Sequence, residues 1–511
     1  MAEENSNKRI ARNTILLYTR SLINLVIGLY TSRLTLDALG IPDYGIYNVV
    51  GSLVALFGLF NGSLNTAISR FITYELGRNN NQRLNKVFSS SLSILFIFAL
   101  VIFIMGETVG LWAINCRMVF PADRMNAVNW VYQISLMTFL VSLLNVAYTA
   151  TLAAHENFRV LATVEILLTG VKVICVILLY YVPMDRLIYF AGYSFLLTLA
   201  SSGFYVFYCM RHYPICRYRA ILDKPFLKEM GAFYSWNLFG SIAWLLKGSG
   251  INVVINLFFG VLINAAQAVA SQVSAGVTAL MGSFSSAMQP QITKSYASGD
   301  YLYMLTLVQS GARFSFYLLL LLSLPIIIET NTILTLWLKN VPEYTVIFVR
   351  LVLVFAMCEV LSGTQITALQ ATGNIRNYQI VVGSLQLLNF PISYLLLGKG
   401  YAPETTMYVA ICLSLGCLFA RLWFLHRQVE ISIKSYFTQV LLNVCVVAVL
   451  AAICPIIVSH LMNAGILRLF VVSGVCAIAT LIVIYYVGLS VQERIFVQKK
   501  IVARIKQKCS A

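Results

Sequence analysis

The sequence predicts an all-α polytopic membrane protein with about fourteen transmembrane helices. Of its 511 residues, 59% are hydrophobic and 11% are charged, and the mean hydropathy is +0.81. A soluble domain carries about a quarter charged residues, whereas a membrane-crossing helix needs about 20 mostly apolar residues. Apolar stretches of that length occupy most of the chain and leave only short loops. We therefore expect no sizeable soluble domain.

The apolar stretches place the transmembrane helices in order along the chain. The N-terminal sequence MAEENSNKRIARN is polar and has no small-residue cleavage site behind a short apolar core, so we expect the first helix to be retained and not removed as a signal peptide. The seventh and eighth helices follow one another almost without a loop. The predicted spans are 13–35, 45–72, 88–112, 127–152, 160–182, 187–210, 229–258, 260–288, 306–330, 344–370, 378–398, 404–426, 436–459 and 464–489.

The net charge of +17 is distributed in a way that predicts the orientation of the chain. If the N-terminus is cytoplasmic, Lys and Arg lie mostly in the cytoplasmic segments, and the positive-inside rule then places both termini in the cytoplasm. The basic tail from Arg494 to Lys508 suits anionic lipid headgroups. Membrane lipids, and not nucleic acid, are the expected partners of this charge. The scattered cysteines and histidines predict no disulfide framework, metal site or cofactor.

An internal repeat at an offset of about 220 residues predicts two related halves. Gly40 and the helix start after it align with Gly260, and Glu107-Thr108 align with Glu329-Thr330. The segment from Leu152 to Arg159 aligns with that from Leu369 to Arg376. Because each half would hold an even number of helices, the halves should be related by a pseudo-two-fold axis along the membrane normal. Two further helices follow at the C-terminus.

The repeat sets the expected domain boundaries. We predict an N-lobe over 1–210 (helices 1–6), a cytoplasmic linker over 211–228, a C-lobe over 229–427 (helices 7–12), and helices 13 and 14 with a basic cytoplasmic tail over 428–511. The two lobes are expected to enclose a central cavity that opens to one face at a time. Helices 13 and 14 are expected to be peripheral.

Polar stripes at helical spacing predict which helices line that cavity. A helix that faces lipid needs no polar face, so such a stripe indicates water or another helix. Small hydroxylated residues are also common where membrane helices touch, but stripes that contain Asn and Gln favour the cavity. They predict a lining by helices 1, 2, 4, 7, 8 and 10. The lining candidates are Asn61, Asn65, Asn145, Gln267, Ser271 and Ser274.

Ionisable residues inside the apolar runs are the candidate binding groups, because charges in hydrocarbon are costly and usually mark a transport route. Lys172 lies about twelve residues into its helix, roughly 18 Å deep, and Lys247 is similarly deep, whereas Arg20 and Arg313 lie nearer the cytoplasmic ends and could snorkel. With these four as cavity cations, and Glu165 and Glu359 as candidates for ion coupling, the site is positive and predicts an anionic substrate. No catalytic residue is expected, and the chain is not expected to be an enzyme.

Several segments resemble a known family. Arg33, Leu39-Gly40 and the stretch Tyr44-Gly45-Ile46-Tyr47 are similar to the first helix end and second helix start of the bacterial polysaccharide-export flippases. The segments LGRNNNQRLNKVFSSSLSI and IIIETNTILTLWLKNVPEY resemble the same family, which belongs to the multidrug/oligosaccharidyl-lipid/polysaccharide superfamily. The resemblance implies an inner-membrane flippase that moves an undecaprenyl-pyrophosphate-linked oligosaccharide to the outer leaflet, with cavity cations handling the pyrophosphate. Its expected partners are that anionic lipid-linked oligosaccharide and other polysaccharide-assembly proteins.

Three other functions compete with that interpretation. A cation-coupled multidrug antiporter of the same superfamily is the main alternative. The N-lobe of such antiporters typically carries a membrane-embedded Asp, whereas the first helix here offers Arg20 and no carboxylate before Asp37. A membrane enzyme acting on the same lipid-linked donor needs an extracytoplasmic catalytic surface, and the longest outer loop, roughly 113–126, is too short for one. An ATP-driven pump is disfavoured because the chain has no G-x-x-x-x-G-K-[ST] motif.

Overall fold

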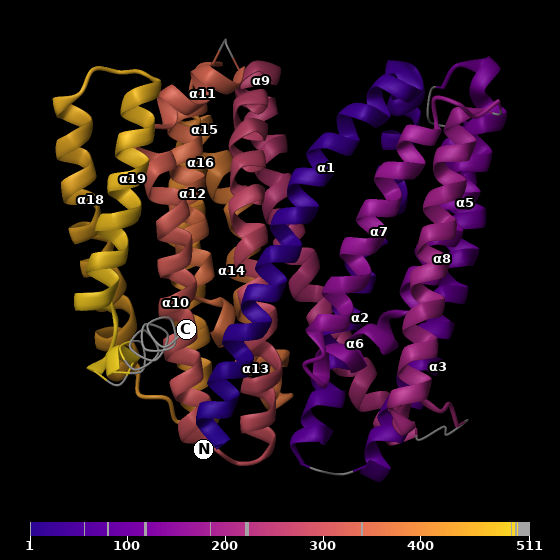
Figure 1. Ribbon diagram of the computed structural model, residues 1–511, viewed down its shortest axis with the longest axis horizontal. Helices are drawn as coiled ribbons and strands as arrows, with labels where there is room; N and C mark the ends of the chain where they lie inside the picture. The colour runs from indigo at the N-terminus through magenta and orange to yellow at the C-terminus, as the bar shows by residue number, and fades with distance from the viewer. Residues whose placement is uncertain are drawn as a thin grey trace, which may run out of the picture. The chain divides into compact units, whose positions relative to one another are not determined.

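The computed structural model describes residues 2–55, 57–78, 81–116, 120–183, 185–219, 224–338, 341–491, 493–495 and 498, and every regular element in this part of the chain is a helix (Figure 1). Most of the predicted basic tail and part of the predicted linker, 220–223, lie outside the described residues. The helices are α1 (Ala2–Ala55), α2 (Gly58–Gly77), α3 (Asn81–Met105), α4 (Leu111–Cys116), α5 (Met125–Leu144), α6 (Val146–Ala154), α7 (Phe158–Leu178), α8 (Arg186–His212), α9 (Lys224–Ala297), α10 (Tyr301–Ile328), α11 (Thr330–Leu338), α12 (Thr345–Val360), α13 (Gly363–Thr372), α14 (Arg376–Leu387), α15 (Asn389–Gly398), α16 (Thr405–Val429), α17 (Ile433–Tyr436), α18 (Asn443–Leu461) and α19 (Ile466–Val483).

Ten helical stretches within the described residues are long and apolar enough to cross a membrane. Each overlaps one of the predicted spans. They are Arg83–Cys116, Met125–Ala154, Phe158–Leu178, Arg186–His212, Tyr301–Ile328, Thr345–Thr372, Arg376–Gly398, Thr405–Val429, Ile433–Leu461 and Ile466–Gly488.

The remaining predicted spans fall on α1, α2 and α9. The 74 residues of α9 would measure about 111 Å as a straight helix, against a hydrocarbon core of about 30 Å, so α9 has the length of two crossings. The predicted spans 229–258 and 260–288, which only Phe259 separates, both lie within this uninterrupted helix. Helix α1 is interrupted at Gly40, whose φ of 76° lies in the left-handed region. A chain of about fourteen membrane-crossing helices, as predicted, is consistent with this pattern.

The chain divides into two compact units. Unit 1 contains Met1–Ile242, Ser286–Tyr301 and Gln370–Gln379, and unit 2 contains Ala243–Ser285, Leu302–Leu369 and Ile380–Ala511. The predicted lobe boundaries remain a prediction beside this division. Two short segments from the second half of the chain, 286–301 and 370–379, group with the N-terminal helices in unit 1, and they carry contacts described below.

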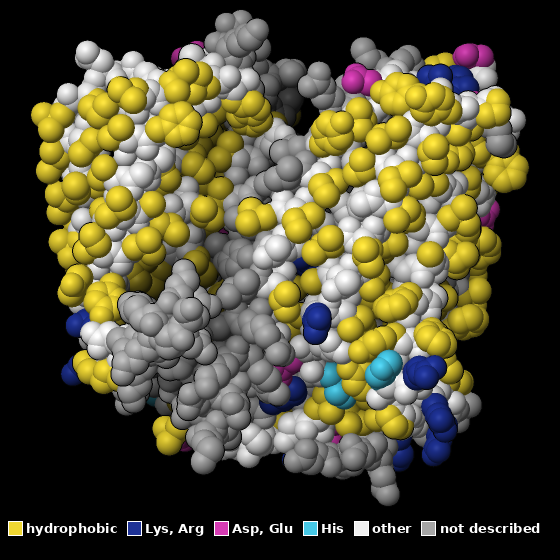
Figure 2. Space-filling view, in the orientation of Figure 1, with side chains coloured by type: hydrophobic (Ala, Val, Ile, Leu, Met, Phe, Trp, Pro, Cys, Tyr) yellow, Lys and Arg dark blue, Asp and Glu magenta, His cyan; other side chains and the backbone are white. Residues whose placement is uncertain are grey.

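Each unit is a set of packed, mostly apolar helices. In unit 1, α1 packs against α7, α2 against α6, and α5 against α8; in unit 2, α12 packs against α16, and α18 against α19 (Figure 1). On α18 and α19 large apolar side chains such as Val449, Leu467 and Phe470 are exposed. Figure 2 shows hydrophobic side chains along the helices of one face, with Lys and Arg mostly near the helix ends. This pattern is that of a multi-pass membrane protein, because lipid solvates the apolar sides of the helices.

Candidate functional site

Two of the predicted residues meet in unit 2, where α9 and α12 bring a lysine and a glutamate together. Lys247 Nζ lies 3.3 Å from Glu359 Oε1, and the Ser414 hydroxyl on α16 donates to the same oxygen at 2.7 Å. The Lys247 side chain is 4% exposed and that of Glu359 is 20% exposed. The ammonium also lies 4.4 Å from the ring centroid of Phe355. Removing two charges from water costs several kcal/mol each, so this pair indicates a functional group more than a source of stability.

A second buried cation stands near that pair. Arg421 on α16 is 3% exposed, and its charge acts on Glu359. Arg421 was not among the predicted site residues, although an arginine within the apolar run 404–426 is the same kind of signal as Lys247. The carboxylate of Glu359 is thus the centre of a small polar cluster inside an otherwise apolar helix bundle.

In unit 1 the predicted residues Arg20 and Glu165 also form an ion pair. Arg20 Nη1 on α1 lies 3.3 Å from Glu165 Oε1 on α7, and the two side chains are 24% and 41% exposed. One turn further along both helices, the Thr169 hydroxyl donates to the amide oxygen of Asn24 at 2.9 Å. A polar seam therefore joins α1 to α7, and its carboxylate is less buried than Glu359.

The other two predicted cations have different surroundings. Arg313 on α10 donates to Glu493 at 2.8 Å and to the carbonyl of Gly488 at 3.3 Å, just after α19. Lys172 is exposed on α7, and no carboxylate of the described residues pairs with it. Three of the four predicted cations are therefore paired with carboxylates, and one of these carboxylates, Glu493, was not among the predicted site residues.

The predicted polar lining residues differ in exposure. Asn145 and Gln267 are buried, Asn61 and Ser274 are half-buried, and Asn65 and Ser271 are exposed. The amide nitrogen of Gln267 lies 3.9 Å from the sulfur of Met407, so this side chain contacts another helix of unit 2. Their role in lining a cavity remains a prediction.

Two further polar clamps in unit 1 were not among the predicted site residues: one holds the last turn of α13, and the other holds the turn after α6. In the first, Arg70 on α2 donates from Nε to the carbonyl of Gln370 at 3.2 Å and from Nη2 to that of Ala371 at 3.1 Å. Its guanidinium also lies against the rings of Phe71 and Tyr74.

The second clamp holds Glu156, in the segment 152–159 that the internal repeat aligns with 369–376. Glu156 accepts from Lys294 Nζ and from Gln291 Nε2, both at 2.7 Å, and its side chain is 3% exposed. Glu156 and Gly373 occupy matching positions in the repeat, and both have left-handed φ values, of 59° and 79°. The two matching positions therefore share a left-handed backbone conformation, and each lies beside a contact with a helix from the other half of the sequence.

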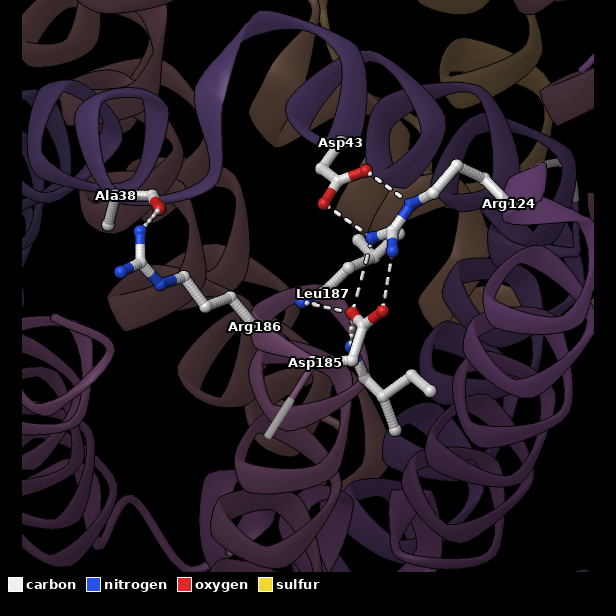
Figure 3. A network of polar contacts seen from close by, with 7 residues as sticks. Ala38, Asp43, Arg124, Asp185, Arg186 and Leu187 are labelled. Atoms are coloured by element: carbon white, nitrogen blue, oxygen red, sulfur yellow. Dashed lines mark hydrogen bonds and ion pairs between the residues drawn. The ribbon is translucent and has the colours of Figure 1, made fainter. Parts of the chain in front are cut away.

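A charged network lies in unit 1 at the face that the positive-inside rule predicts to be outside (Figure 3). Arg124 donates to Asp43 at 3.0 Å and to Asp185 at 2.6 Å, and Asp185 caps the start of α8 by accepting from the backbone N–H groups of Leu187 and Ile188. Burial raises the pKa of Asp185, but these hydrogen bonds outweigh it and lower the pKa below its ordinary value. The network ties the start of α8 to the segment after Gly40.

The comparisons with known proteins concern the fold. No protein-family model and no curated protein sequence matches the chain. A solved structure described as an outward-facing multidrug resistance MATE family transporter of the MOP superfamily is similar, with 11% identity over 83% of this chain and 96% of that one and a TM-score of 0.73. A MATE transporter variant from Vibrio cholerae has 12% identity over 83% of this chain and 98% of that one, with a TM-score of 0.68.

A third solved structure is a MOP superfamily transporter from Pyrococcus furiosus, described as having a binding pocket of reverse polarity that suggests a different function. It has 12% identity over 84% of this chain and 97% of that one, and a TM-score of 0.67. At these identities the likeness shows the fold alone. The chain is thus a multi-pass membrane protein with the MATE transporter fold.

The prediction of an oligosaccharide-lipid flippase is wrong by this comparison, since the similar structures include MATE transporters, one of them described as a multidrug resistance transporter, and none is described as a polysaccharide flippase. The structure changes one part of the charge count behind that prediction. Arg20 and Lys247 pair with Glu165 and Glu359, which the count already included, but Arg313 pairs with Glu493, which it did not. Counting charges along the sequence does not reveal this pairing.

Proposed function

We propose that this protein is a cation-coupled exporter of the multidrug antiporter type, with Glu359 as its main coupling group. The observation that carries the proposal is the Lys247–Glu359–Ser414 cluster, a carboxylate held among membrane helices by a built-in cation and a hydroxyl. The comparisons add one supporting observation, which is that the chain shares its fold with a multidrug resistance transporter.

The cluster suits exchange between cations. A buried carboxylate needs a positive partner, because leaving it unpaired costs several kcal/mol. In the state described here Lys247 is that partner. We propose that a proton or metal cation replaces Lys247 at Glu359 in one stage of the cycle, and that a cationic substrate and the coupling ion compete for this carboxylate. Glu165, paired with Arg20, is the second candidate for coupling.

We propose that the two polar clamps must break during the transport cycle. Alternating access requires polar contacts that form in one state and open in the other. Arg70 on 370–371 and Lys294 on Glu156 each join segments that lie far apart in the sequence, through hydrogen bonds that solvent could replace on opening. They are the candidates for contacts that close the predicted cytoplasmic face.

The proposal is tested by deletion and complementation with cationic dyes. In cells without other dye exporters, deletion of the gene should raise the accumulation of ethidium, and the wild-type chain should lower it again. Glu359→Gln should fail to complement, while its amount in the membrane matches wild type. An unchanged accumulation of several unrelated organic cations on deletion would contradict the exporter proposal.

A further inference from the structure

A basic pocket in unit 1 is not explained by export. It has a volume of about 640 Å³ and lies beside the Arg70 clamp, where the end of α2, the start of α3, the start of α9 and the loop after α13 meet. We call it the basic pocket. Its charged lining residues are Arg70, Arg78, Arg83, Lys86, Glu75 and Glu229.

The charge of the basic pocket favours an anion. Four basic side chains face two carboxylates, so two positive charges remain in excess. The two carboxylates have partners among the four, since Glu75 lies 4.0 Å from Arg83 and the charge of Glu229 acts on Arg70. Arg70 at its base is 6% exposed and is fixed by two backbone carbonyls, which leaves its positive charge uncompensated by them. Arg78 and Lys86 at the rim are exposed.

The basic pocket lies at the ends of two apolar spans, where we expect the surface of the membrane. Arg83 begins one apolar span and Thr372 ends another, so the pocket lies at the level where these helices leave the hydrocarbon. By the positive-inside rule this is the predicted cytoplasmic side, where anionic headgroups attract basic residues. Arginine binds phosphate through bidentate hydrogen bonds, and lysine binds it as a point charge.

We propose that the basic pocket binds a phosphate group, carried by an anionic phospholipid headgroup or by a soluble phosphate anion. The volume exceeds that of phosphate alone and has room for a headgroup. A phosphate there would lie against Arg70 and so next to its contact with the last turn of α13. This site is separate from the Glu359 cluster, which lies in unit 2.

The test is a binding measurement on the purified full-length protein, so its outcome does not depend on export. Native mass spectrometry would compare retention of dioleoylphosphatidylglycerol with that of dioleoylphosphatidylcholine, and inorganic phosphate would be added as a competitor. The variant Arg78→Gln/Lys86→Gln removes two rim charges and spares the buried Arg70. The control Arg159→Gln/Arg211→Gln removes two exposed charges on α7 and α8, outside the basic pocket.

We expect wild type and control to retain phosphatidylglycerol preferentially, and the rim variant to bind it about tenfold or more weakly, because each basic residue near an anionic headgroup contributes about a factor of five. Equal retention of the two lipids, together with binding of added inorganic phosphate that the rim variant loses, would identify a soluble anion as the occupant. Preference for phosphatidylglycerol that phosphate leaves unchanged would identify the lipid. Equal losses in the rim variant and the control, or no binding of either probe, would overturn the proposal.

Discussion

At the scale of single residues, Glu359 has the environment that most sets it apart. Both Glu359 and Glu165 are paired with a cation at 3.3 Å, but Glu359 is 20% exposed with a partner that is 4% exposed, against 41% and 24% for Glu165 and Arg20. The two ion pairs have the same N–O distance but differ in burial, so comparing the two carboxylates isolates the effect of burial. The more buried one has the stronger need for a positive partner.

The first prediction follows from that comparison. Glu359→Gln should lower dye export by more than about tenfold, the effect of losing about 1.4 kcal/mol of interaction, whereas Glu165→Gln should lower it less. Export would be measured in vesicles with equal amounts of inserted protein. A variant Glu359→Gln that transports as well as Glu165→Gln would remove Glu359 from the coupling role.

The second prediction concerns the Arg124 network and pH. Since the pKa of Asp185 is lowered in the folded protein, its contribution to stability is present in full above the unfolded pKa of about 3.9 and is lost as pH falls through the lower folded pKa. Asp185→Asn should cost about 1–2 kcal/mol at neutral pH. The difference in melting temperature from wild type should stay constant between about pH 5 and 8 and shrink only under stronger acid.

Its control is the neighbouring Asp123, which is exposed. Asp123→Asn should leave the melting temperature almost unchanged at every pH, because an exposed carboxylate contributes little. A difference between wild type and Asp185→Asn that grows or shrinks between about pH 5 and 8 would show that another group controls the network.

At the scale of elements, the helices could be predicted and their partners could not. Long apolar runs fix where helices cross the membrane, so all ten described spans overlap the predicted ones. Which helix faces which is not encoded in apolar runs, because lipid and protein neighbours are similarly apolar. Arg70, for example, binds a backbone carbonyl 300 residues away. Because every residue has a backbone carbonyl, the sequence does not indicate which one an arginine contacts.

The third prediction tests the first clamp through Gly373. A Cβ at this residue would lie 2.5 Å from Arg70 Nη2, and its φ is also left-handed. Gly299 has nearly the same φ, 80° against 79°, but open space around it. Gly299→Ala should cost only the conformational term of about 1–2 kcal/mol, and Gly373→Ala should cost more, because it also displaces the guanidinium.

The two variants would be compared by thermal unfolding in detergent. A lower melting temperature for Gly373→Ala than for Gly299→Ala is expected, and adding Arg70→Gln to each should remove the difference between them. Equal melting temperatures for the two glycine variants would show that the Arg70 contact contributes nothing beyond the backbone.

At the scale of the whole molecule, the predicted all-helical membrane fold is confirmed, and the predicted flippase function is wrong. Composition and span length were sufficient for a helical membrane protein, since they depend on local hydropathy. Substrate charge depends on which charges cancel, and the cancelling partners lie 145, 112 and 180 residues apart in the chain. The same separation explains why Glu165 and Glu359 could be singled out while their pairing with Arg20 and Lys247 could not.

The measurement that tests the exporter proposal most directly uses purified protein in liposomes loaded with a cationic dye. Imposing an inward gradient of protons or of sodium should drive dye transport by wild type, and collapse of that gradient should stop it. Glu359→Gln should transport no dye in either gradient, while Glu165→Gln retains part of the activity. Dye movement that ignores both gradients, or full activity of Glu359→Gln, would contradict cation-coupled export through this carboxylate.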